Sequence, residues 1–209
     1  NIEKSFHDPV TIPILKKISF SINKGDFVSV IGKSGCGKST LLYILSTMDT
    51  SYEGELYIDD ELMTGKKEKE LARVRNEKIG FVFQFHYLLP EFTCLQNVMI
   101  PALKLDKYSS EEIEQRAYNK LDILGLKDQA LKPASKLSGG QQQRVAIARA
   151  IANTPKILLA DEPVASLDPA TCHTVMDYLR KVNQELGITI ICNLHFLSLV
   201  RQYATRVIA

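Results

Sequence analysis

The sequence predicts an α/β fold, in which a parallel sheet is interrupted by a helical insert, from three observations. Short apolar segments alternate with helical segments along most of the 209 residues, a pattern typical of layered α/β proteins. A glycine-rich turn joins one apolar segment directly to the helical segment that follows it. Between about residues 85 and 142 the pattern is helical, with prolines and no apolar strand. This stretch is therefore expected to be the insert.

The first part of the chain supplies strands and two helices. The segment 18–22 alternates apolar and polar residues, as a half-buried strand does, while 79–83 is apolar throughout, as in a strand buried on both faces. The segment 68–78 is strongly charged and is predicted to be a solvent-facing helix. The expected strands here are 18–22, 26–31, 54–60 and 79–83, and the expected helices are 38–48 and 68–78.

The insert contains one well-marked helix, after which the alternation resumes. The helix is predicted over 109–126, because Ser and two Glu open it, apolar positions recur at helical spacing and Gly125 can end it. The apolar positions are Ile113, Ala117, Leu121 and Leu124. Beyond the insert the expected strands are 156–160, 187–194 and 206–209, and the expected helices are 169–186 and 196–204.

Composition limits the classes of function. Hydrophobic residues make up 45% and charged residues 24%, and the formal net charge is only +2, which gives no case for a nucleic-acid surface. The four cysteines show no CxxC spacing, so reduced thiols are expected rather than a metal site or a disulfide framework. No apolar run reaches the roughly 20 residues of a membrane-spanning helix.

The glycine-rich turn, GKSGCGKST, has the pattern of a phosphate-binding loop. It matches G-x-x-x-x-G-K-[ST], and the strand before it and the helix after it favour a P-loop over an ordinary turn. Its glycines allow backbone N–H groups to converge on phosphate oxygens, its lysine adds a positive charge, and its serine hydroxyl can bind Mg²⁺. The candidate nucleotide-binding residues are Gly32, Lys33, Ser34, Gly35, Cys36, Gly37, Lys38, Ser39 and Thr40.

Four polar residues follow predicted strands, where ligand sites of parallel sheets form. Asp161 is expected to hold Mg²⁺ and Glu162 to polarise the attacking water. The alternative is that both acids only favour the start of a helix, which is the weaker interpretation beside a P-loop. His195 and Gln84 also end strands. His195 is either structural or functional, and Gln84 either lies on the surface or reaches Mg²⁺ or water.

The order of these motifs resembles the ATP-binding subunits of ATP-binding cassette (ABC) transporters over essentially the whole chain. The resemblance rests on Walker A at 32–40, the glutamine loop at Gln84, LSGGQ at 137–141, Walker B at 157–162, SLD at 166–168 and the switch histidine His195. It implies that Glu162, His195, Lys38 and Gln84 act in catalysis, and that Ser39, Gln84 and Asp161 hold the metal. It further implies nucleotide contacts from Ser138, Gly139, Gly140, Gln141 and Asp168, with the ring of Phe6 stacked on adenine or, alternatively, buried in the core.

The resemblance also implies an organisation and a set of partners. The expected fold is that of a P-loop NTPase with a RecA-like parallel-sheet core, a small antiparallel β subdomain and an inserted helical subdomain. The chain would be one domain, 1–209, with its core at 1–84 and 143–209 and its helical subdomain at about 85–142. The implied cofactors are ATP and Mg²⁺. The implied partners are a second ATPase subunit, expected to form a homodimer, and transmembrane permease subunits at the cytoplasmic face of the inner membrane.

The motifs favour a transport ATPase over two alternatives. A soluble, non-transport ABC ATPase is disfavoured because only 53 residues separate Gln84 from Ser138 and there is one P-loop. A module with inactive chemistry is disfavoured because Glu162 and His195 are intact. The N-terminal two thirds resemble lipoprotein-releasing and macrolide-export ATPases, and the C-terminal third resembles phosphonate-import ATPases, so the cargo stays open. The segment 84–103 is expected to form much of the groove for the membrane partner, with core packing as the alternative.

Overall fold

A computed structural model of the chain describes residues 1–7 and 10–209. Its centre is a five-stranded sheet in the order β6–β7–β8–β3–β9, and every neighbouring pair is parallel. The strands are β3 (Phe27–Val30), β6 (Ile79–Val82), β7 (Ile157–Asp161), β8 (Thr189–Asn193) and β9 (Arg206–Ile208). The carboxyl ends of these strands therefore share one edge, where a ligand site of such a sheet is expected.

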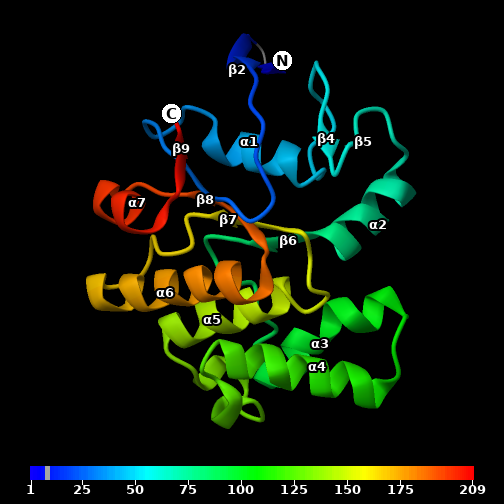
Figure 1. Cartoon of the computed structure of the whole chain (residues 1–209), viewed down its shortest axis with the longest axis vertical. Coiled ribbons are helices and arrows are strands. Elements are labelled where there is room, and N and C mark those ends of the chain that lie inside the picture. Colours follow the sequence, from blue (N-terminus) through cyan, green and yellow to red (C-terminus); the bar gives the residue numbers. More distant parts are fainter. Residues whose placement is uncertain (8–9) are drawn as a thin grey trace.

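Helices cover both faces of this sheet (Figure 1). On one face, α1 (Lys38–Leu45) and α2 (Glu68–Lys78) pack over a core that includes Val28, Leu42 and Leu159. On the other face, α5 (Gly139–Ala150), α6 (Pro169–Leu186) and α7 (Leu197–Tyr203) pack over a larger core. The middle strands are buried on both sides, which is why most of their residues are apolar rather than alternating with polar ones.

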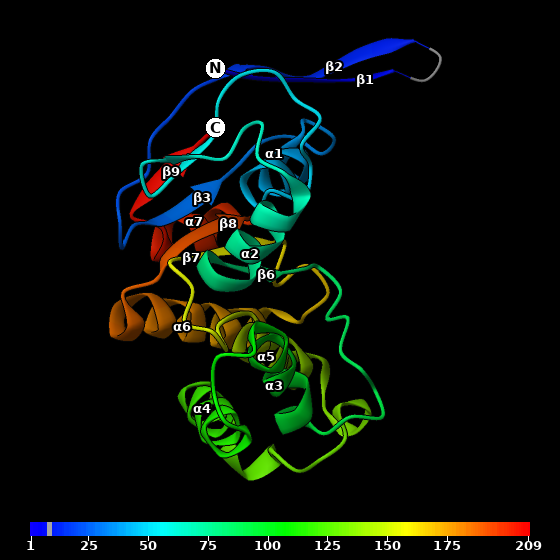
Figure 2. The ribbon, with the colours of Figure 1, turned by 90° about the vertical axis from the view of Figure 1, so that its right-hand side faces the viewer.

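The insert forms a separate helical layer beyond α5 and α6 (Figure 2). It consists of α3 (Cys94–Leu105), α4 (Ser110–Ile123) and the short 3₁₀ turns η1 (Lys127–Gln129) and η2 (Ala134–Lys136). The four apolar positions noted in the predicted helix are all buried; three lie on α4 and Leu124 directly follows it. Helix α5 runs without a break across residues 142 and 143, so the subdomain boundaries drawn at 84/85 and 142/143 stay a prediction.

Two small antiparallel sheets complete the fold, and they correct two expected strands. The strand expected at 18–22 is wrong: β2 (Thr11–Ile18) pairs with β1 (Ile2–His7) and ends where 18–22 was to begin. Phe20 and Ile22 do pack against the core. The alternation at 18–22 therefore reflects burial of these side chains and not pairing with a neighbouring strand. The strand expected at 54–60 is reduced to β4 (Tyr57–Ile58), because the chain turns back at once into β5 (Glu61–Leu62).

The remaining elements agree closely with the sequence pattern. Helices 68–78 and 169–186 have the expected bounds. The helix expected over 38–48 ends three residues early, at Leu45. Within the described ranges, 1–7 and 10–209, no helix is both long enough and apolar enough to cross a membrane.

Candidate nucleotide site

The glycine-rich loop between β3 and α1 holds its lysine inward. The side chain of Lys38 is 7% exposed, and its Nζ donates to the carbonyl oxygens of Gly32 and Lys33 at 2.9 Å each. Gly37 precedes α1 with φ +95°, and a Cβ there would lie 2.7 Å from the side chain of Ile14. Only glycine fits this turn, because it tolerates both the left-handed backbone and the close approach of β2. The loop thus encloses one ammonium group at a helix N-terminus, an arrangement suited to phosphate.

A buried carboxylate lies beside the first turn of α1. Asp161 ends β7, is 7% exposed, and accepts a hydrogen bond from Ser39 Oγ at 3.0 Å through Oδ1. The same oxygen accepts from Asn193 Nδ2 at 2.8 Å. No lysine, arginine or histidine among the described residues forms an ion pair with Asp161. A hydroxyl and an uncompensated carboxylate are the oxygen donors that Mg²⁺ prefers, so these residues fit that metal.

The next residue in the chain carries a second acid. Oε1 of Glu162 lies 2.5 Å from Nε2 of His195, although the two residues follow different strands. Glu162 has φ +49°, a conformation that is uncommon outside glycine and that recurs at functional sites. This backbone turn separates the directions of two adjacent carboxylates: Asp161 contacts Ser39, and Glu162 contacts His195.

Gln84 lies just beyond β6 and is exposed, with no hydrogen bond to any described residue. The loop that begins there is fastened to α5. Arg149 donates to the carbonyl oxygens of His86 and Tyr87 at 2.8 and 2.7 Å, and Gln143 Oε1 lies 2.6 Å from His86 Nδ1. Burial lowers the pKa of Arg149. The LSGGQ segment lies at the start of α5, and the glutamine loop is hydrogen-bonded near the end of α5. This helix therefore links the two segments.

The LSGGQ segment forms the start of α5 and faces outward. Ser138 caps the helix by accepting from the N–H of Gln141, whose side chain accepts from the N–H of Ser138. Ser138 and Gly139 are exposed. Gly140 is buried, and a Cβ there would lie 2.3 Å from Thr171 Cγ2. No hydrogen bond or ion pair between described residues joins this segment to the P-loop.

Asp168 caps the neighbouring helix, α6. Its carboxylate accepts from the N–H of Thr171 at 3.0 Å, and this side chain and backbone contact with Thr171 lowers the pKa of Asp168. Because Gly140 packs on Thr171, the SLD and LSGGQ segments lie next to each other on one surface of the chain.

Phe6 lies within β1, paired with Ile12 of β2, rather than ahead of the first strands. Its side chain is 50% exposed, so the core alternative is wrong. The ammonium of Lys4 lies 5.3 Å from the centre of its ring. The ring is available for stacking because no core contact requires it.

The sequence interpretation missed Asn193, Gln143 and Arg149. Asn193 could have been noticed, because it is an amide that directly follows the apolar residues Ile190, Ile191 and Cys192 in a predicted strand. Gln143 and Arg149 both lie on α5. Their contacts with the glutamine loop span 57 to 63 residues, so spacing alone gave no signal.

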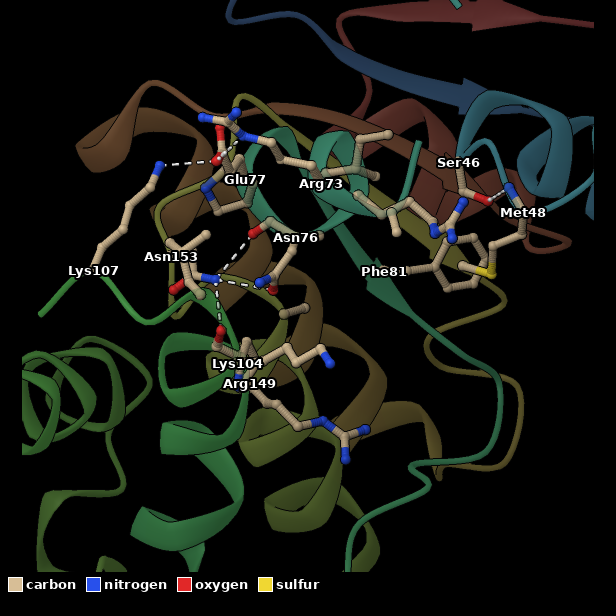
Figure 3. A pocket seen from close by; sticks show the side chains of 18 residues that line it. Ser46, Met48, Arg73, Asn76, Glu77, Phe81, Lys104, Lys107, Arg149 and Asn153 are labelled. Atoms are coloured by element: carbon tan, nitrogen blue, oxygen red, sulfur yellow. Dashed lines mark hydrogen bonds and ion pairs between the residues drawn. The ribbon is translucent and has the colours of Figure 1, made fainter. Parts of the chain in front are cut away.

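A cleft of about 640 Å³ opens between the sheet and the helical layer (Figure 3). It is lined by α2, the end of α3, β6 and the end of α5. Of the segment 84–103, only Pro101 lines this cleft. Cys94, Leu95 and Val98 are instead buried in the core. Phe85, Tyr87, Leu89 and Phe92 of the same segment are exposed. The segment therefore contributes to both the core and the surface, and its expected part in a groove for the membrane partner stays a prediction.

The fold and this site define a P-loop nucleoside triphosphatase. The family model for ABC transporters matches residues 15–165, and the chain belongs to this family, as an ATP-binding subunit that hydrolyses ATP.

Relatives of two kinds are similar to this chain. The lipoprotein-releasing system ATP-binding protein LolD of Aquifex aeolicus (strain VF5) is 52% identical, over 87% of this chain and 80% of that protein. The phosphonates import ATP-binding protein PhnC of Bdellovibrio bacteriovorus is 45% identical, over 100% of this chain and 82% of that protein. The ATP-binding cassette MJ0796, solved as a dimer in a post-hydrolysis state with ADP and Pi, is 41% identical with a TM-score of 0.89, over 100% of this chain and 91% of that one.

Proposed function

We propose that two copies of this chain close head to tail around ATP and Mg²⁺, and that closure drives a transmembrane permease. The observation that carries this proposal is the division of polar groups between two surfaces. The P-loop, Asp161 and Glu162 lie together at the sheet edge, while the exposed Ser138 and Gly139 contact none of them. A nucleotide on one copy would therefore meet the LSGGQ segment only if a second copy supplied it.

At the sheet edge, Ser39 and Asp161 would hold Mg²⁺, with Gln84 reaching it from the glutamine loop. Bound there, the metal neutralises phosphate charge and orients the terminal phosphate. Lys38 would leave its two carbonyl acceptors for phosphate oxygens, which are stronger acceptors because they are charged. The exposed ring of Phe6 would stack on the base, and the remaining P-loop residues would supply N–H groups.

Glu162 is the proposed general base. It accepts a proton from the attacking water, whose oxygen then bonds to the γ-phosphorus as the bond to the β-phosphate oxygen breaks, giving ADP and phosphate. His195 would orient Glu162 and the water through the contact between Nε2 and Oε1. From the opposite copy, Ser138, Gly139, Gly140 and Gln141 would bind the γ-phosphate, and Asp168 would line the same interface. Loss of that phosphate removes the contacts that favour closure.

The proposed membrane partner docks a cytoplasmic helix in the cleft between the sheet and the helical layer. The charged side chains of the cleft favour an acidic segment, because they comprise five cations and one anion. They are Arg73, Arg75, Lys104, Lys107, Arg149 and Glu77. Glu77 is already paired with Arg73 and Lys107, whereas Lys104 has no ion pair with a described residue. Such docking would place the chain at the cytoplasmic face of the membrane.

Mixing two inactive variants tests the head-to-tail arrangement. Lys38→Ala removes the P-loop lysine, and Ser138→Arg blocks the LSGGQ segment. In a mixed dimer one site carries both changes and the other carries neither. We expect each variant alone to be inactive and the mixture to regain part of the ATPase activity. A mixture as inactive as its components, at concentrations where dimers form, contradicts the proposal.

A further inference from the structure

Strand β8 ends in a buried amide that the catalytic assignment leaves unused. Asn193 lies in the middle of the sheet, opposite Asp161 of β7 and Val30 of β3, and its side chain is 0% exposed. The two preceding residues, Ile191 and Cys192, are buried and apolar. A buried amide is unfavourable at such a position unless it forms hydrogen bonds. Its one hydrogen bond therefore identifies what the amide does.

That hydrogen bond is to the carboxylate proposed to hold the metal. Asn193 Nδ2 donates to Asp161 Oδ1 at 2.8 Å, and Ser39 Oγ donates to the same atom at 3.0 Å. No described residue donates to Asp161 Oδ2. Two donors thus fix one oxygen of the carboxylate and leave the other free. The register of β7 and β8 builds this contact, since paired residues of neighbouring strands project from the same face.

The amide oxygen of Asn193 supports this orientation, in which the amide nitrogen faces Asp161. Asn193 Oδ1 is buried and has no hydrogen-bond partner among the described residues. Reversing the amide would place this oxygen against the Asp161 carboxylate, where two acceptors repel. The side chain therefore leaves its own acceptor unpaired in order to donate to Asp161.

We propose that Asn193 is a positioning residue that orients Asp161 toward the nucleotide-bound metal. This inference rests on the proposed Mg²⁺ site, to which it adds the outer contact that holds the carboxylate. Removing partners of this kind commonly lowers metal affinity by roughly 10- to 100-fold. Asn193 itself touches neither metal nor nucleotide, so metal-free ATP binding should not depend on it.

The test compares Asn193→Val with Asn193→Thr, which have the same shape and differ by one hydroxyl donor. Mn²⁺ binding to the nucleotide-loaded protein is measured by electron paramagnetic resonance, and ATP binding is measured with and without Mg²⁺. For Asn193→Val we expect the apparent Mn²⁺ dissociation constant to rise by about 10-fold or more, with unchanged ATP affinity in EDTA. Asn193→Thr should lie between this variant and the wild type. Cys192→Ala is the matched control, because it alters the adjacent buried residue without touching Asp161.

A Mn²⁺ affinity of Asn193→Val within twofold of the wild type overturns the inference, and so does an equal loss in Cys192→Ala. If the Val variant does not fold, Asn193→Ala and Asn193→Ser provide the same contrast of a hydroxyl with none. ATP binding by the wild type, with and without Mg²⁺, distinguishes failure of the proposed metal site from failure of the positioning role alone. If Mg²⁺ does not strengthen its ATP binding, the proposed metal site fails; if it does and Asn193→Val retains the gain, only the positioning role fails.

Discussion

Nε2 of His195 lies 2.5 Å from Oε1 of Glu162, across a gap of 33 residues in the chain. The contact joins the loop after β7 to the loop after β8. The contact therefore holds the Glu162 carboxylate, which is proposed to activate water, in place at the P-loop edge of the sheet. It does so within a single copy of the chain, before a second copy binds.

Glu162→Gln tests this carboxylate as the general base. The amide keeps the shape of the side chain but cannot accept the water's proton, so we expect ATP hydrolysis to fall by roughly 100- to 10,000-fold. ATP binding should persist, and the variant should accumulate as an ATP-bound dimer in size-exclusion chromatography with light scattering. Turnover at the wild-type rate would refute the assignment of the base.

Phe6→Ala tests the adenine contact. Loss of a stacking ring is expected to weaken nucleotide binding by about 1–3 kcal/mol, the value for one stacked base, and therefore to raise the KM for ATP while kcat changes little. Phe6→Tyr keeps the ring and should keep the KM. Ile12→Ala, directly opposite on β2, is the control for the hairpin; if it raises KM as much as Phe6→Ala, the hairpin rather than the ring is responsible.

Cys36 is expected to make the ATPase sensitive to thiol-alkylating reagents. Its thiol is exposed and its Sγ lies 3.9 Å from Lys38 Nζ, so an added group would occupy the phosphate cradle. Cys94, Cys172 and Cys192 are buried. Alkylation should abolish ATP hydrolysis, ATP should protect, and Cys36→Ala should be resistant. Inhibition that persists in Cys36→Ala would place the sensitive group elsewhere.

Tyr87→Glu and Lys104→Glu test the docking cleft. Tyr87 is 65% exposed on the loop that Arg149 holds beside the cleft, and Lys104 lines it. The new charges should repel an acidic helix and abolish stimulation of the ATPase by the co-purified membrane subunit. Basal hydrolysis measured without that subunit serves as the reference, and Lys181→Glu on α6 serves as the charge control. Full stimulation of both cleft variants would remove the cleft from the proposal.

Glu61 makes a prediction about acid stability. Hydrogen bonds from Lys66 and Lys78 lower the pKa of its carboxyl to about 2. Because this pKa is lower in the folded chain than in the unfolded chain, where it is about 4.3, the pairs stabilise the fold above that value. Their contribution is lost as the pH falls toward 2. Glu61→Gln should show a shallower fall of the thermal midpoint over this range, most clearly at low salt.

Glu114→Gln, an exposed residue of α4 without an ion pair among the described residues, is the control for this titration. Identical pH profiles for the wild type and Glu61→Gln would show that the two lysines do not stabilise the hairpin β4–β5.

The chain's own sequence determined the α/β class, the parallel strands and the phosphate loop. These depend on local pattern: runs of apolar residues in strands buried on both faces, and a glycine turn between a strand and a helix. Helix 169–186 was placed correctly because Asp168 caps its start and Gly187 ends it with φ +63°. Local pattern also misled, since the alternation at 18–22 records contact with the core and not membership of a sheet.

Only the tertiary structure decided which polar groups meet. The contacts of Asp161 with Asn193, of Glu162 with His195 and of Arg149 with the loop after Gln84 join residues 32 to 63 positions apart. They depend on the order of strands in the sheet and on the packing of α5 against the insert. Strand order is set by which buried surfaces pack best together, and no short stretch of sequence contains that information. The nucleotide contacts of the LSGGQ segment were expected from the family resemblance; the fold adds that Ser138 and Gly139 at the start of α5 are exposed.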